Sequence, residues 1–160
     1  MVPRRPARPD SARIFVPPPL LYAGGLILGL AIDGRLHTDA TLIDGPGRWI
    51  AAALAVAGAA FIAAGLGRFW SLGTPPEPWA PAKLLVTSGI YRWTRNSMYL
   101  GLNLLYAGLA LLLWSPSAGA LLVPLFAIMN FILIPREEAY LERRFGEDYR
   151  AYRRRTRRWL

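Results

Sequence analysis

The segment Leu84-Leu85-Val86-Thr87-Ser88-Gly89-Ile90-Tyr91-Arg92-Trp93-Thr94-Arg95-Asn96-Ser97-Met98-Tyr99-Leu100-Gly101 is the most polar, turn-rich and aromatic part of the chain between two long apolar runs. Its Thr-Ser-Gly cluster favours a turn. Its aromatic rings are of the kind found at a membrane–water boundary. A ligand site needs a similar mixture, because a few polar groups must converge on an apolar wall. The segment therefore predicts either a surface loop with headgroup-binding arginines or the polar edge of a pocket.

Outside this segment, apolar blocks alternate with charged stretches. The chain of 160 residues is 54% hydrophobic, yet its formal net charge is +9. No charged residue occurs in 14–32, 49–67 or 96–135. Because a membrane span needs about 20 mostly apolar residues, the first two runs supply one helix each. The third is long enough for two helices, with a break at Trp114-Ser115-Pro116-Ser117.

We therefore predict an all-α integral membrane protein that forms a single domain over residues 1–160. It should have about four transmembrane helices, at about 15–32, 49–70, 97–113 and 118–134. The first apolar stretch is longer than the hydrophobic region of a signal peptide and is followed by no convincing cleavage site, so we expect a retained anchor. Gly25 and Gly29 form a small-xxx-small pair that suits ordinary helix packing and would also permit a homodimer. A monomer and a homodimer both remain open.

The charged stretches predict the orientation in the membrane. Their net charges are +3 for 1–13, −1 for 33–48, +3 for 68–95 and +4 for 136–160. Positive charge near helix ends stays on the cytoplasmic side. Four spans place the three positive stretches on one side, so we expect both termini in the cytoplasm. This architecture is compatible with a bacterial inner membrane.

The stretch 136–160 predicts an amphipathic cytoplasmic helix. Leu141, Phe145, Tyr149 and Tyr152 recur at helical spacing and form one apolar stripe. The closing arginine-rich run, 153–158, is expected to contact anionic lipid headgroups.

Glu137 heads this stripe at the end of a membrane helix, whereas Glu138 is rotated away from it by about 100°. We expect the Glu137 carboxylate to point into the protein, because ionisable groups so placed are usually functional or paired. The alternative is a structural salt bridge from Glu137 to Arg92, Arg95 or another nearby arginine.

The composition excludes several kinds of site. Cysteine is absent, so a disulfide framework, a thiolate metal site and a cysteine nucleophile are excluded. His37 is the single histidine and lies in a polar loop, so we expect it to be solvated and predict no metal site. The basic charge flanks the predicted spans, and no nucleic-acid partner is therefore expected.

Two motifs resemble those of the isoprenylcysteine carboxyl methyltransferases. The wider group to which these enzymes belong includes phospholipid methyltransferases. The first comprises 85–91 with Trp93, Arg95 and Tyr99-x-Gly101. The second comprises Glu137-Glu138, then 145–149 and Tyr152. They occur in the family's order, with a predicted helical hairpin between them, and the resemblance covers about 83–158.

The resemblance implies a membrane methyltransferase that uses S-adenosylmethionine. The family's cofactor contacts would fall on Lys83, Leu84, Leu85, Val86, Tyr91, Asn96, Ser97, Met98, Tyr99 and Glu137. Arg92, Arg95 and Arg136 are candidates for binding the substrate, a membrane lipid or lipid-like molecule. No catalytic residue is assigned.

The sequence departs from the family pattern at two positions. Asn96-Ser97 replaces the usual His-Pro pair, and asparagine forms hydrogen bonds but is no titrating base. Leu133 occupies the position of the arginine that binds a prenylcysteine, which puts that substrate in doubt. With no evident general base, a carboxylate or thiolate acceptor is favoured over a protonated amine.

Three functions are therefore weighed. The leading one is an S-adenosylmethionine-dependent methyltransferase acting on a lipid-like or small hydrophobic substrate. The second is a non-catalytic membrane protein of the same fold, with a lipid-binding or assembly role. The third, a subunit or fragment of a transporter, is weakened because the predicted spans contain no charge.

Overall fold

The computed structural model describes residues 16–36, 44–74 and 82–160. The elements are α1 (Pro18–Arg35), α2 (Gly47–Ser71), the 3₁₀ turn η1 (Gly89–Arg92), α3 (Ser97–Leu112), α4 (Pro116–Ile128), the π-helical turn η2 (Met129–Leu133), α5 (Ile134–Phe145) and α6 (Glu147–Arg155). The described residues contain helices but no strand, apart from an isolated parallel bridge between Thr94 and Arg157. The predicted all-α class is confirmed.

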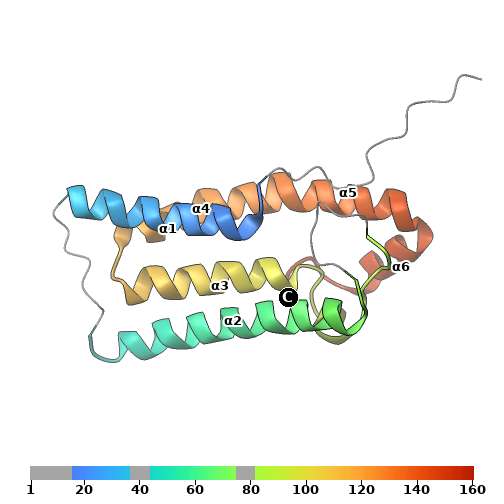
Figure 1. The fold of residues 1–160 in the computed structure, drawn as a ribbon, viewed down its shortest axis with the longest axis horizontal. Coiled ribbons are helices and arrows are strands. Elements are labelled where there is room, and N and C mark those ends of the chain that lie inside the picture. The colour runs from blue at the N-terminus through green and yellow to red at the C-terminus, as the bar shows by residue number, and fades with distance from the viewer. Residues whose placement is uncertain (1–15, 37–43, 75–81) are drawn as a thin grey trace, which may run out of the picture.

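The long helices lie along the longest axis of the molecule as two adjacent pairs, α2 with α3 and α1 with α4 (Figure 1). Glycines bring the backbones of the first pair together. A Cβ atom on Gly58 would lie 2.3 Å from the backbone nitrogen of Leu105, and one on Gly108 would lie 2.5 Å from that of Ala55. Because lipid offers little hydrophobic drive for helix association, such close backbone packing holds membrane helices together.

The predicted small-residue pair of the first helix packs within the chain. A Cβ atom on Gly29 would lie 2.4 Å from the Cα atom of Ala118 in α4, and one on Gly25 would lie 2.7 Å from the Leu125 side chain. The face that would permit a homodimer therefore contacts α4, and the glycines serve ordinary packing.

The turn between the third and fourth helices lies where proline and serine predicted it. Helix α3 ends at Leu112 and α4 begins at Pro116, whose ring is tolerated in the first turn of a helix. The Ser115 side chain accepts a hydrogen bond from the Ala118 amide and caps α4. The predicted break is confirmed.

The predicted end of the fourth helix at residue 134 is wrong. Helices α4 and α5 form one continuous helix from Pro116 to Phe145, which is apolar up to Pro135 and charged beyond it. The π-helical turn η2 lies directly before Pro135, and the Ile134 amide bonds to the Met129 carbonyl. This wider turn rearranges the backbone hydrogen bonds where the proline ring would interrupt an ordinary α-helix.

The predicted continuous C-terminal helix is also divided. Gly146 adopts φ +54°, a conformation that glycine reaches at little cost, and it separates α5 from α6. The apolar stripe nevertheless faces inward, since Leu141 and Phe145 before the break are half-buried and Tyr149 and Tyr152 after it are buried. Helix α6 turns back towards the bundle instead of extending α5 (Figure 1).

Two helical segments in the described part of the chain are long and apolar enough to cross a membrane: α2 and the continuous helix Pro116–Phe145. Only 17% of the apolar window of α2 is buried within the chain, as expected for a helix that contacts lipid. Helix α3 is apolar but shorter. The chain is therefore a membrane-associated helical protein. The predictions for the N-terminal stretch and for His37 lie outside the described residues.

We predict that Gly58→Ala lowers the thermal midpoint of unfolding in detergent. The added methyl group would meet the α3 backbone, and overpacking of this kind costs about 1–3 kcal/mol. Gly67→Ala in the same helix is the matched control, because no atom lies within 4 Å of its added Cβ. Equal midpoints for the two variants would contradict the backbone packing described here.

Candidate functional site

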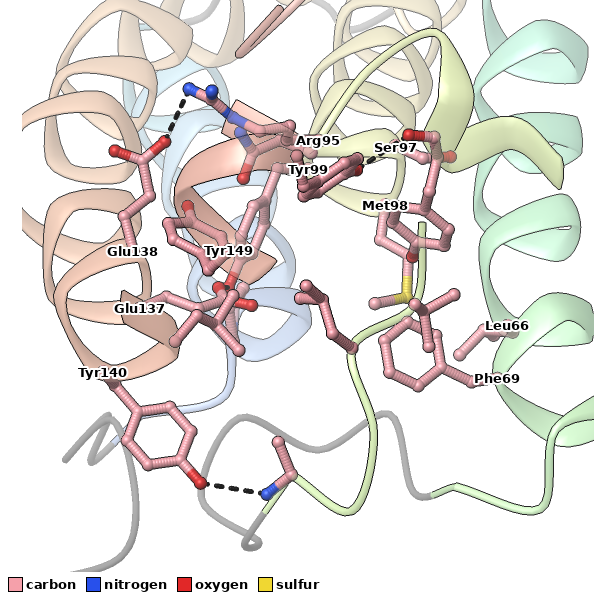
Figure 2. Close-up of a pocket in the computed structure, with 18 of the residues that line it drawn as sticks. Leu66, Phe69, Arg95, Ser97, Met98, Tyr99, Glu137, Glu138, Tyr140 and Tyr149 are labelled. Atoms are coloured by element: carbon pink, nitrogen blue, oxygen red, sulfur yellow. Dashed lines mark hydrogen bonds and ion pairs between the residues drawn. The ribbon is translucent and has the colours of Figure 1, made fainter. Parts of the chain in front are cut away.

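A cavity of about 290 Å³ lies at the end of the bundle where α2, α5 and α6 meet the segment 82–96. Its wall is mainly apolar, with a few polar side chains from α3, α5 and the segment before α3. Figure 2 shows Glu137, Glu138 and Tyr140 of α5 across the cavity from Leu66 and Phe69 of α2. Ligand pockets typically combine a largely apolar wall with a few positioned polar groups, and this cavity has that composition.

The segment 82–96 is fastened to helices on both sides of the cavity. From α5, the Tyr140 hydroxyl accepts a hydrogen bond from the Ala82 amide at 3.0 Å (Figure 2). From α2, the Arg68 guanidinium donates to the Ser88 hydroxyl at 2.6 and 2.9 Å. Gly89, with φ +64°, makes the turn into η1 at the predicted Thr-Ser-Gly cluster. The polar segment is therefore a fixed wall of the cavity.

Glu137 places a carboxylate in this wall. The Tyr99 hydroxyl donates to its Oε2 atom at 2.7 Å. No lysine or arginine among the described residues forms a salt bridge with Glu137, so the alternative of a structural salt bridge to Arg92, Arg95 or another nearby arginine is wrong. A largely apolar cavity therefore contains the Glu137 carboxylate, a hydrogen-bond acceptor that has no cationic partner among the described residues.

The neighbouring glutamate takes the ion pairs instead. Glu138 is buried, and its Oε1 atom lies 2.9 Å from Nη2 of Arg95. A dashed line in Figure 2 marks this ion pair. The Oε2 atom of Glu138 lies 2.6 Å from Nη2 of Arg158. Helical spacing places Glu138 off the apolar stripe, on a side of α5 that the sequence alone leaves without a neighbour. In the structure, the chain returns after α6 and brings Arg158 to that side.

Tyrosines supply most of the remaining polar atoms. Tyr91 is buried, and its hydroxyl is one of two buried side-chain polar atoms in the described residues that have no hydrogen-bond partner. Tyr152 donates to the Tyr91 carbonyl at 2.7 Å and joins α6 to η1. Burial is the main cause that raises the pKa values of Tyr91, Tyr149 and Tyr152. Their hydroxyls therefore stay protonated at neutral pH and remain hydrogen-bond donors.

The structure brings together most of the residues that the sequence singled out for cofactor binding. Those that line the cavity are Leu84, Leu85, Val86, Tyr91, Asn96, Ser97, Met98, Tyr99 and Glu137. Lys83 is exposed and is not part of the lining. Residues 84–99 and Glu137, which a helical hairpin separates in the sequence, therefore line the same cavity.

The three candidate substrate-binding arginines are separated. Arg92 and Arg136 are exposed and lie outside the lining. Arg95 lines the cavity, but its guanidinium already bonds Glu138 and the carbonyls of Arg153 and Thr156, at 3.0 and 3.1 Å. Its Nε atom is the second buried atom without a partner.

The rest of the lining, apart from Arg95, lies outside the set of residues that the sequence singled out as binding residues. These residues are Pro18, Pro19, Ile62, Leu66, Phe69, Ala82, Leu102, Glu138, Tyr140, Leu141, Tyr149 and Tyr152. The apolar stripe had marked Leu141 and the last two tyrosines as inward-facing. Nothing in the uniformly apolar α2 sequence distinguishes its cavity face from its lipid face.

Comparison with known proteins gives a family for this arrangement. The sequence profile described as phospholipid methyltransferase matches residues 47–148, which include α2 to α5 and most of the cavity wall. An uncharacterized protein of Haemophilus influenzae is 40% identical over 63 residues, which make up 39% of this chain and the whole of that protein. No solved structure matches the chain.

We predict that Glu138→Gln lowers the thermal midpoint in detergent far more than Glu147→Gln does. The first change leaves the buried Arg95 without its carboxylate, and breaking a buried pair costs about 3–5 kcal/mol. Glu147 pairs with Arg150 and Arg154 on the exposed face of α6, where solvent screens an ion pair and its loss changes stability little. A similar midpoint for both variants would show that the Glu138 cluster is not a structural anchor.

Proposed function

This chain belongs to the phospholipid methyltransferase family, and we propose that it is an S-adenosylmethionine-dependent methyltransferase acting on a lipid-like or small hydrophobic substrate. The observation that carries the proposal is the Glu137 carboxylate. It is held by the Tyr99 hydroxyl in a largely apolar cavity and has no cationic partner among the described residues. Such a group suits a positively charged ligand.

The residues of the cavity fit this cofactor in three respects. S-adenosylmethionine carries a sulfonium and an ammonium group, and both are attracted by a carboxylate and by aromatic faces. Tyr91 offers a buried hydroxyl that lacks a partner, which a polar ligand would satisfy. The apolar part of the wall, including Leu85 and Met98, suits the flat adenine ring.

When bound, the cofactor supplies an electrophilic methyl group that needs little activation. The protein's contribution is then mainly positioning and exclusion of water, and positioning can lower a barrier by about 7–11 kcal/mol. In this proposal Glu137 binds a cationic part of the cofactor and is itself oriented by Tyr99. Tyr91 and Tyr149 enclose the site with protonated hydroxyls and do not act as bases.

The acceptor that fits this cavity is hydrophobic. Ile62, Leu66 and Phe69 of α2 and Leu141 of α5 give the wall its apolar character. Arg92 and Arg136, which lie outside the lining, suit contact with an anionic lipid headgroup at the membrane surface better than contact with a ligand inside the cavity.

We propose four spans, with both termini in the cytoplasm. Besides α2 and the continuous helix from α4 to α5, the apolar helices α1 and α3 run alongside them (Figure 1). The exposed arginines of α6 lie at the same end as the cavity, where positive charge favours the cytoplasm. This orientation places the site in the compartment that supplies the cofactor, and a bacterial inner membrane is the proposed location.

Calorimetric titration of the detergent-purified chain with S-adenosylhomocysteine, the demethylated cofactor, tests the proposal. We expect saturable binding that weakens by about tenfold or more in Glu137→Ala, because a hydrogen bond to a charged group contributes about 1.5–3 kcal/mol. Glu142→Ala in the same helix is the control and should retain the affinity of the original chain, since Glu142 faces Arg150 and Arg153 on the surface.

Two results would count against the proposal. Unchanged affinity in Glu137→Ala would contradict the role of this carboxylate. No binding by the folded chain, under conditions in which a known methyltransferase of the family binds, would favour a non-catalytic membrane protein.

The absence of cysteine makes the proposed topology directly testable by single-cysteine labelling. We predict that an impermeant thiol reagent labels Asp44→Cys in intact cells but labels Arg155→Cys only after permeabilisation. Both positions are exposed in the structure. The cysteine-free chain measures background labelling. Labelling of both variants in intact cells would place them on the same outer side and overturn the four-span topology.

A further inference from the structure

Residues 156–159 run alongside the segment that precedes α3. The backbone amide of Arg95 donates to the Arg157 carbonyl at 3.0 Å, next to the isolated parallel bridge between Thr94 and Arg157. The Arg158 carbonyl then accepts two side-chain hydrogen bonds, from the Thr94 hydroxyl at 3.2 Å and from the Asn96 amide at 2.9 Å. The C-terminal end accordingly lies beside the first turn of α3 (Figure 1).

The Arg158 side chain reaches the opposite wall of the cavity. Its Nη2 atom donates to Oε2 of Glu138 at 2.6 Å, and its Nε atom lies 3.3 Å from Oε1. Arg95 donates to the same Oε1 atom at 2.9 Å. Arg158 therefore connects α5 through its guanidinium and the start of α3 through its carbonyl.

Trp159 fixes the next position to the continuous membrane helix. Its indole nitrogen donates to the Asn130 side-chain oxygen at 3.2 Å, within the π-helical turn. Its ring stacks on Phe126 with the centroids 5.2 Å apart. Three adjacent positions, 157–159, are thus attached to the segment before α3 and to two places on the continuous helix, which is far more than a loosely attached basic tail requires.

We propose that residues 156–159 form a strap that holds the polar wall of the cavity in its ligand-binding arrangement, with Arg158 as its positioning residue. The proposal rests on the proposed function, because the wall in question contains Asn96 and Glu137. Arg158 does not line the cavity. Its backbone carbonyl holds Asn96 by hydrogen bonding, and its guanidinium fixes the strap to Glu138, the residue next to the Glu137 carboxylate.

The strap also gives Asn96 a role. Its side-chain amide is a hydrogen-bond donor to a carbonyl, a task that needs no titrating group. Asn96 is buried at the start of α3, where its carbonyl accepts from the Leu100 amide. The residue therefore ties the first turn of α3, which carries Ser97 and Tyr99, to the strap.

The test combines two measurements on full-length Arg158→Gln. In the ligand-free protein, hydrogen–deuterium exchange should become faster in peptides covering 92–99 and 156–160, because the strap opens more often. In titrations with S-adenosylhomocysteine, the dissociation constant should rise by roughly tenfold, as expected for the loss of charge-assisted hydrogen bonds. Arg158→Lys keeps the charge and should recover part of both effects.

Arg157→Gln is the matched control. It removes the same charge from the adjacent position. Among the described residues, however, its exposed side chain hydrogen-bonds only to the Leu160 carbonyl, at 3.5 Å, and its own carbonyl still accepts from Arg95. Its hydrogen–deuterium exchange and its affinity for S-adenosylhomocysteine should equal those of the wild-type protein. Equal effects of Arg157→Gln and Arg158→Gln would overturn the proposal, since net charge alone would then explain them.

The exchange measurement separates this proposal from the proposed function. Unchanged exchange at 92–99 in Arg158→Gln would overturn the strap even if the ligand binds. If the original chain binds no S-adenosylhomocysteine, the proposed function fails, and faster exchange in Arg158→Gln but not Arg157→Gln would still support the strap.

Discussion

The carboxylate of Glu138, placed between two guanidinium groups, is the interaction on which the organised end of this bundle depends. Arg95 approaches it from the segment before α3, and Arg158 approaches it from beyond α6. A charge buried at the end of an apolar bundle is costly unless it is paired and hydrogen-bonded. This single cluster satisfies three charges at once, and it joins three segments that are far apart in the chain.

Because Arg95 and Arg158 pair with Glu138, the Glu137 carboxylate remains available to a ligand in the cavity. Two adjacent carboxylates at a helix end would repel each other if both lacked partners, and the two arginines offset the charge of one of them. Within the described part of the chain, the other accepts a side-chain hydrogen bond from the Tyr99 hydroxyl alone. The result is a division of roles between neighbouring residues, in which one glutamate stabilises the wall and the other offers its charge to a ligand.

Much of the fold could be predicted from the sequence, because apolar runs and turn formers report local structure directly. The runs located all four long helices, and Ser115-Pro116 located the turn between α3 and α4. The continuation of α4 into α5 could not be predicted, because it depends on a π-helical turn before Pro135. The roles of Glu137 and Glu138 were only half predicted, since a helical wheel contains no information about the returning residues near Arg158. Likewise, Leu66 and Phe69 join the cavity only through the packing of α2 on the rest of the bundle.

The most direct test of the account is an experimental structure of the full chain, in lipid, with S-adenosylhomocysteine. The account predicts ligand density in the cavity between α2 and α5, with a polar group of the ligand bonded to Glu137 and the Tyr91 hydroxyl within hydrogen-bonding distance of it. Density for the ligand at another place on the protein, or a cavity filled by side chains while the ligand is present in excess, would contradict the central claim.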